Sequence, residues 1–313
     1  MSSKQQLIDE LLSSISQHKP YPENTAHMEI NGNKVLNSVP VEGLHIDTEE
    51  IEEGIHAKIR VDKGTKIEND VHLCFGVLPE TGVQRIELDV EMEEGAEASF
   101  LAHCTFPNAK KVQHIMNARI HLGPHAHYDY FERHVHGDSG GIEVIPKAEV
   151  HLDEGARFKT EFELIKGRVG KMDIDYTTYC AKDSSVEMTA RIHGQDDDVV
   201  KIKETGVLEG ENSRGVLVSN IALQDSAYAE VYNDLTAKAP YAKGHVDCKE
   251  IVQDNAVARA IPIVQVNHPL AHVTHEAAIG SVDSKQLQTL MSRGMSEEDA
   301  VDLIIQGLLR GNR

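Results

Sequence analysis

The sequence predicts a mainly β protein, a right-handed parallel β-helix (a solenoid) with a short N-terminal helix and a C-terminal helical hairpin. Side chains alternate with the period of two that is typical of strands through the long middle of the chain. A turn motif recurs in the same region with a step near 30 residues, which is typical of a stacked repeat. The 313 residues include only 4% aromatic residues and no tryptophan, which suits a narrow interior filled by small and β-branched side chains.

The first expected element is a short amphipathic helix over residues 4–16. Its leucines and isoleucines recur at helical spacing, and Pro20 and Pro22 prevent its continuation. Residues 23–55 give only weak signals for either helix or strand. We therefore assign residues 1–55 to an N-terminal helix and a connecting segment.

Residues 56–282 are expected to form the β-helix core. In each copy of the turn motif an apolar residue precedes two turn formers, a residue that tolerates a left-handed backbone, and a small residue. The copies lie at 61–65, 92–96, 122–126, 152–156, 181–185, 223–227 and 252–256. Their last residues are separated by 31, 30, 30, 29, 42 and 29 residues, and the long step predicts an extra loop around residues 206–215.

Residues 283–313 are expected to form a helical hairpin. Asp283 or Ser284 can cap a first helix, and Gly294 can end it. A capping box at 296–299 starts the second helix. The hairpin carries more apolar residues than a surface cap needs, so they either pack on the solenoid or bind a partner. The candidate partner-binding residues are Leu287, Leu290, Met291, Leu303, Ile304 and Leu308.

Charge and composition exclude several functions. The chain has 51 acidic and 31 basic residues, a net charge of −20, which repels the phosphates of nucleic acids. Apolar stretches such as 260–264 are far shorter than the ~20 residues that span a membrane, and no secretory signal opens the chain. We expect a cytoplasmic protein. Its cysteines, Cys74, Cys104, Cys180 and Cys248, form no CxxC pair and are expected to be free thiols.

The first candidate site is a histidine-rich segment at 121–136. His125 and His127 are expected on one strand face, and Glu132 follows five residues later. Imidazole and carboxylate groups in this pattern can bind zinc, iron or manganese. The set resembles the first metal motif of the cupin family, although Arg119 stands where that motif has a glycine. The alternative is a polar face whose histidines meet solvent.

The second candidate is Cys248. A thiolate is a strong nucleophile and a soft ligand for iron. His245 and Lys249 are close in sequence and could promote ionisation of the thiol. The alternative is that Cys248 is simply a small residue buried in a strand.

The third candidate is the segment at 267–280, just before the terminal helices. It holds His268, His272, His275 and Glu276 within a few residues. The adjacent His275 and Glu276 offer an imidazole and a carboxylate together. The alternative is a polar junction that covers the open end of the solenoid.

The C-terminal part of the chain resembles the SufB/SufD family of iron–sulfur cluster assembly proteins. The motifs that carry the resemblance are GHVDC at 244–248, IPIV at 261–264, VTHEA at 273–277 and MSRGMSEEDAVDLIIQG at 291–307. The resemblance is close over 241–310 and loose over 56–313. The family fold is a parallel β-helix flanked by helical ends, in agreement with the repeat. The N-terminal region is much shorter than in familiar family members.

The resemblance implies that Cys248, His275 and Glu276 bind a transient iron–sulfur cluster. Cys248 and the segment 275–277 match the SufB form of the family, while Thr274 stands where SufB often has another acid. The family heterodimer takes a histidine from its SufD side that also matches His275. One chain that carries all of these residues could therefore act as a homodimer, or pair with a second SufB/SufD-type chain.

The resemblance also implies a scaffold rather than an enzyme. Its partners would be a sulfur donor protein and a SufC-like ABC ATPase that docks on the terminal helices, and no nucleotide would bind to this chain. Two other functions stay open from the residues alone. One is a cupin-like metal-binding protein that uses His125, His127 and Glu132, and the other is a non-catalytic β-solenoid interaction module.

Overall fold

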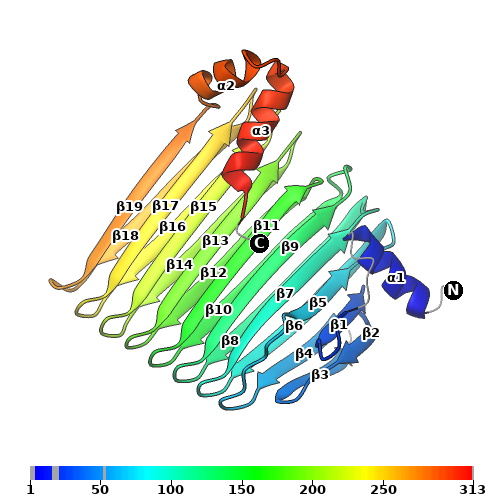
Figure 1. The fold of residues 1–313 in the computed structure, drawn as a ribbon, viewed down its shortest axis with the longest axis vertical. Helices are drawn as coiled ribbons and strands as arrows, with labels where there is room; N and C mark the ends of the chain where they lie inside the picture. The colour runs from blue at the N-terminus through cyan, green and yellow to red at the C-terminus, as the bar shows by residue number, and fades with distance from the viewer. Residues whose placement is uncertain (1–3, 16–20, 52–53, 312–313) are drawn as a thin grey trace.

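The structure is a computed structural model that describes residues 4–15, 21–51 and 54–311. It is a parallel β-solenoid of about eight turns, in which two large sheets face each other across a narrow interior (Figure 1). This confirms the mainly β fold that the repeat predicts. Helices lie only at the ends of the chain, and no helix in these ranges is both long and apolar enough to cross a membrane.

One sheet has ten strands and the other has nine. In spatial order, the ten are β19 (His272–Gly280), β17 (Lys243–Val252), β15 (Arg214–Leu223), β13 (Ser185–Gly194), β11 (Arg157–Lys166), β9 (His127–His136), β7 (Glu97–Phe106), β5 (Val71–Gly76), β1 (His27–Asn31) and β2 (Lys34–Val39). The nine are β18 (Val257–Val266), β16 (Tyr228–Ala237), β14 (Val199–Leu208), β12 (Gly170–Cys180), β10 (Ile142–Leu152), β8 (Lys111–Leu122), β6 (Thr81–Met92), β4 (Gly54–Val61) and β3 (Leu44–Ile51). Neighbours pair in parallel except in the hairpins β1–β2 and β3–β4.

Each coil contains two strands and two turns, one turn at each edge of the stack. The predicted loop around 206–215 is therefore wrong, because most of this stretch lies in β14 and β15. The motif copies through 181–185 belong to one edge, whereas 223–227 and 252–256 belong to the other edge. The step of 42 arose from crossing between edges. Along the first edge the period continues, since Ser184, Ser213 and Ala242 are all fully buried and lie 29 residues apart.

The turns use two kinds of left-handed residue. In the first four copies of the motif this residue is the fourth, as expected, and it is usually a glycine. In the three later copies it is the third residue, Asp183, Asp225 or Asp254, each with φ close to +57°. Aspartate tolerates this conformation because its short side chain can bond to the local backbone.

The N-terminal part extends the two sheets. Helix α1 (Lys4–Ser14) agrees with the expected helix, although residues 16–20 lie outside the described residues. Leu11 of α1 is buried against Leu36 and Cys74. The region with weak sequence signals contains β1, β2 and β3, and β1 pairs with β5 in parallel. The solenoid sheets therefore begin well before residue 56.

The C-terminal hairpin agrees with the predicted helix limits. In α2 (Ser284–Met291) the Asp283 side chain accepts a hydrogen bond from the backbone of Gln286, and Ser296 caps α3 (Glu297–Leu309) in the same way. Helix α3 packs on the outside of β15, where its Ile305 and Leu309 bury Ala222. The hairpin thus lies beside the last coils, at the opposite end of the stack from α1 (Figure 1).

Only part of the hairpin's apolar surface is used for this packing. Of the six candidate partner-binding residues, Met291 and Leu303 are exposed, with 41% and 46% of their surface accessible. The other four, Leu287, Leu290, Ile304 and Leu308, are half-buried.

Candidate functional site

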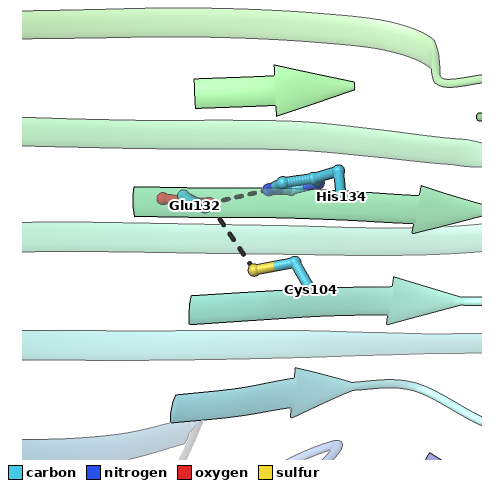
Figure 2. Close-up of side chains that lie close together, drawn as sticks. All are labelled: Cys104, Glu132 and His134. Carbon is cyan, nitrogen blue, oxygen red and sulfur yellow. Dashed lines mark hydrogen bonds and ion pairs between the residues drawn. The ribbon is translucent and has the colours of Figure 1, made fainter. Parts of the chain in front are cut away.

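A cluster of polar side chains interrupts the apolar interior near the middle of the stack. Cys104, Glu132 and His134 are each 1% exposed or less. The Cys104 thiol donates to Glu132 Oε1 at 3.5 Å, and His134 Nε2 lies 2.7 Å from the same oxygen (Figure 2). One ligand atom from each residue lies within 4.8 Å of the other two. A thiol, an imidazole and a carboxylate are thus close enough to share a metal ion.

The period of the solenoid creates this cluster. Cys104 on β7 pairs in register with His134 on the next coil, 30 residues later. Glu132 lies two residues before His134, so both point to the same inward face of β9. His114 reaches the cluster from β8 in the facing sheet, with its Nε2 3.9 Å from Cys104 Sγ. Three coil strands from two sheets therefore meet at one point.

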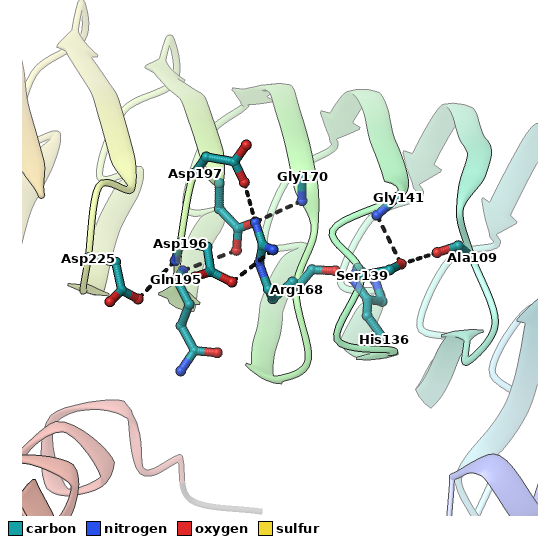
Figure 3. Close-up of polar contacts among 11 residues, drawn as sticks. Ala109, His136, Ser139, Gly141, Arg168, Gly170, Gln195, Asp196, Asp197 and Asp225 are labelled. Carbon is teal, nitrogen blue, oxygen red and sulfur yellow. Dashed lines mark hydrogen bonds and ion pairs between the residues drawn. The ribbon is translucent and has the colours of Figure 1, made fainter.

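A second layer of hydrogen bonds holds the histidines. Gln84 Oε1 lies 2.8 Å from His114 Nδ1, and His136 Nε2 lies 3.0 Å from His134 Nδ1. His136 Nδ1 in turn lies 3.1 Å from the carbonyl oxygen of Arg168. Arg168 is fixed in its turn by ion pairs with three consecutive aspartates at 196–198 (Figure 3). The cluster is thereby connected to the edge of the solenoid.

Burial controls the ionisation of these groups. It raises the pKa of the Cys104 thiol well above its usual value, and the neighbouring charge of Glu132 adds to this effect. Burial also lowers the pKa of His114 to about 3, with a smaller contribution from the charge of His134. For Glu132 burial opposes ionisation, but the hydrogen bond and charge of His134 outweigh it and hold the pKa below its usual value. His114 is therefore neutral at physiological pH.

The structure places Cys248 at the other candidate site, on β17, one coil before the open end. It is fully buried, and Asn233 Nδ2 donates to its Sγ at 3.4 Å. Burial raises the pKa of the thiol, while hydrogen bonds from Ser219 and Asn233 act in the opposite direction. Cys248 stacks between Ser219 and Ala277 of the neighbouring coils.

The strand register separates His275 from Glu276. His275 pairs with Val246, so it projects to the same inward face as Cys248. Glu276 pairs with Asp247 and projects to the outward face. Both side chains are exposed, because β19 is the last strand of its sheet. The last coil is 29 residues long, and this one extra residue moves Glu276 off the face that a 28-residue spacing suggested.

The structure does not bring the cupin-like set together. His125 occupies a turn with φ of +59° and is exposed. His127 projects outward on β9, where its Nδ1 lies 4.0 Å from Glu97, whereas Glu132 projects inward. The alternative of a solvent-facing histidine segment is also wrong in part, since His134 and His136 are buried.

Sequence reasoning missed two groups of inward polar residues. The first is Cys104, His114 and His134, whose signal was the 30-residue spacing of Cys104 from His134. The second is Glu250, which alternates with Cys248 on β17 and is only 3% exposed. Neither oxygen of Glu250 has a hydrogen-bond partner among the described residues, and burial raises its pKa to about 7. All four cysteines are free, as expected.

These features define a parallel β-solenoid with buried thiol, imidazole and carboxylate groups that suit iron and sulfur. Residues 80–308 match the family model described as "SUF system FeS cluster assembly, SufBD core domain". The chain therefore belongs to the SufBD family of iron–sulfur cluster assembly proteins, as its C-terminal motifs suggested.

Curated relatives carry the same family description. An iron–sulfur cluster assembly SufBD family protein of Methanocaldococcus jannaschii is 38% identical over 99% of both chains. One from Pyrococcus horikoshii is 36% identical over 90% of this chain and 85% of its own length. A longer relative from Staphylococcus saprophyticus is 23% identical over 80% of this chain and 54% of its own length. The two archaeal relatives thus share nearly the full length of the chain.

Proposed function

We propose that this chain is a scaffold on which an iron–sulfur cluster is built and then released, rather than an enzyme that turns over a small molecule. Cys248, His275 and Glu276 hold the transient cluster, and a donor protein supplies the sulfur. The observation that carries this proposal is that Cys248 and His275 share the inward face of adjacent coils at the open end of a SufBD-family solenoid.

The chemistry of these residues suits a cluster that must leave. A cysteine thiolate binds iron and can carry a persulfide. Imidazole and carboxylate groups are harder ligands than thiolates and hold a cluster less firmly. One cysteine cannot complete a cluster that usually takes four protein ligands, so a second chain must contribute.

The carboxylate ligand can come from either face of the last coils. Glu276 points away from the Cys248 of its own chain, so it would serve a cluster shared with a paired copy. Glu250 lies on the same inward face as Cys248 and has both oxygens unpartnered in the described structure. Glu250 is therefore a further candidate ligand on the same chain.

Anaerobic reconstitution with iron and sulfide tests the proposal, with visible absorbance and iron content as the readouts. Cys248→Ser is expected to lose the cluster, while His275→Ala, Glu276→Ala and Glu250→Gln each weaken it. Cys180→Ser is the matched control, because Cys180 is an equally buried free thiol in another coil. A Cys248→Ser protein that assembles a normal cluster and supports iron–sulfur enzymes in cells would contradict the assignment.

The terminal hairpin is the proposed dock for a SufC-like ABC ATPase. Helix α3 is anchored to the solenoid through Ile305 and Leu309, which leaves Leu303 and Met291 free to contact a partner. Hydrolysis of ATP would then take place in the partner subunit and would act on this chain through the hairpin.

A further inference from the structure

The hydrogen-bond partners of His114 fix its tautomer. Gln84 Nε2 donates to the carbonyl oxygens of Gly32 and Gly76, at 2.8 and 3.1 Å, so the Gln84 Oε1 atom is the one that faces His114. Because that oxygen only accepts, His114 Nδ1 must carry the hydrogen. His114 Nε2 is therefore a bare lone pair, and it faces Cys104 Sγ at 3.9 Å.

The same reasoning applies to His134. The carbonyl oxygen of Arg168 only accepts, so His136 must donate to it from Nδ1. Neutral His136 then accepts at Nε2 from His134 Nδ1, at 3.0 Å. His134 Nε2 is left to face Glu132 Oε1 at 2.7 Å. Both histidines thus present Nε2 inward while outer acceptors hold Nδ1–H, the arrangement that orients histidine ligands in metal sites.

The proton count of the cluster also suits a dication. His134 already donates from Nδ1, so the short contact between its Nε2 and Glu132 requires one extra proton between them. Cys104 carries a second proton on sulfur. A divalent ion bound to the sulfur, to Nε2 and to the carboxylate would release these two protons to solvent. The net charge of the buried site would not change, and no electron transfer is needed.

The distances leave little rearrangement for such an ion. Tetrahedral zinc has Zn–S of about 2.3 Å and Zn–N of about 2.0 Å, which puts its ligand atoms about 3.3–3.5 Å apart. The contacts within the cluster range from 2.7 Å to 3.9 Å. Glu132 Oε2 is buried without a hydrogen-bond partner in the described part of the chain, so it too is available.

We propose that Cys104, Glu132 and His134, with His114 as the fourth donor, bind a single divalent transition-metal ion of the Zn²⁺ or Fe²⁺ class. Thiolate, imidazole and carboxylate together suit both ions. The site is separate from the proposed cluster site, since Cys248 lies on β17, five strand spacings or about 24 Å from β7. The metal site therefore does not depend on the proposed function.

The metal must enter while the coils form, because all four donors are almost completely buried. The full-length chain is therefore produced in cells grown with Co²⁺, a spectroscopic probe for zinc and iron sites. We expect one cobalt per chain and a thiolate-to-cobalt charge-transfer absorption. Anaerobic production with both Fe²⁺ and Zn²⁺ then shows by metal analysis which ion the site selects.

The variants are chosen to keep the fold. Cys104→Ser and Glu132→Gln are nearly isosteric, and each is expected to lose the absorption and more than tenfold of the bound cobalt. Cys180→Ser and Cys248→Ser are expected to keep both, which separates this site from the cluster site. Wild-type protein with cobalt should also unfold about 5 °C above protein refolded with a chelator, and Glu132→Gln should show no such difference.

Two results would overturn the proposal. One is a folded wild-type chain with substantially less than one cobalt per chain after production in Co²⁺. The other is cobalt content and absorption in Cys104→Ser and Glu132→Gln that equal those of the wild type. Loss of cobalt from Cys248→Ser alone would place the metal at the other end of the solenoid.

Discussion

Glu204 on β14 is a carboxyl group inside the core with no ionic partner. Its side chain is 2% exposed, and burial raises its pKa to about 8. The folded chain therefore binds a proton that the unfolded chain, with a glutamate pKa of about 4.3, releases across neutral pH. Folding stability is fully present below that unfolded value and is lost as the pH rises through the folded value.

Replacing Glu204 with glutamine should remove this pH dependence. Between pH 5 and pH 8 the wild type is expected to lose up to about 1.4 kcal/mol of unfolding free energy per pH unit relative to Glu204→Gln. Urea unfolding at a series of pH values measures the difference. Parallel pH curves for the two proteins would show that Glu204 does not retain a proton in the fold.

Asp198 is the buried member of the aspartate run that holds Arg168. It accepts from Arg168 and from the backbone amides of Gly170 and Gln195, and it is fully buried (Figure 3). Asp198→Ala should lower the unfolding free energy by about 3 kcal/mol, because it leaves a buried guanidinium without its main partner. Asp197→Ala is the control, since the side chain of Asp197 is 90% exposed. Equal effects of the two substitutions in denaturant unfolding would contradict this interpretation.

At the residue scale the sequence predicted the turn positions better than the buried polar groups. Glycines and aspartates mark the corners, because few other residues adopt a left-handed backbone. His134 and Glu132 looked like part of an exposed polar segment, because inward and outward residues of β9 are both polar. Only the pairing of Cys104 with His134 one period later reveals the inward set, and that pairing requires the exact coil length.

Among the elements, α3 has two faces with different expected roles. Ile305 is buried on β15 and anchors the helix, while Leu303 is exposed. Leu303→Asp is expected to leave thermal unfolding unchanged and to abolish co-purification with a SufC-like ATPase. Gln306→Asp, an exposed change of the same charge on the same helix, should keep the interaction. An ATPase that still binds Leu303→Asp would place the dock elsewhere.

The terminal helices were predictable, and the N-terminal strands were not. Capping residues and apolar spacing identify α2 and α3 locally. Strands β1, β2 and β3 are short, and two of their pairings are antiparallel hairpins that share no period with the coils. Their place in the sheets depends on contacts with β4 and β5, which a repeat search cannot find.

For the whole molecule, the open end is the expected place for a second copy. Strands β18 and β19 are the edges of their sheets, and Val257, Val266 and Ile279 are each 48% exposed there. Unpaired edge strands with apolar side chains favour association. We expect a dimer in sedimentation equilibrium, and Ile279→Glu should be monomeric. Val83→Glu, at a similarly exposed site far from this end, should remain a dimer. A wild-type chain that stays monomeric at high concentration would contradict pairing at this end.

The hairpin also has a mechanical consequence. It leaves the stack at β19, yet α3 rests on β15 through Ile305, Leu309 and Ala222, two strands further in along the same sheet. A push on the exposed side of α3 would therefore act as a lever, with β15 as its fulcrum and the terminal coil as its load. Because β19 has a neighbour on one side only, it is the strand that such a torque would peel away first. The strand that it would uncover is β17, which carries Cys248.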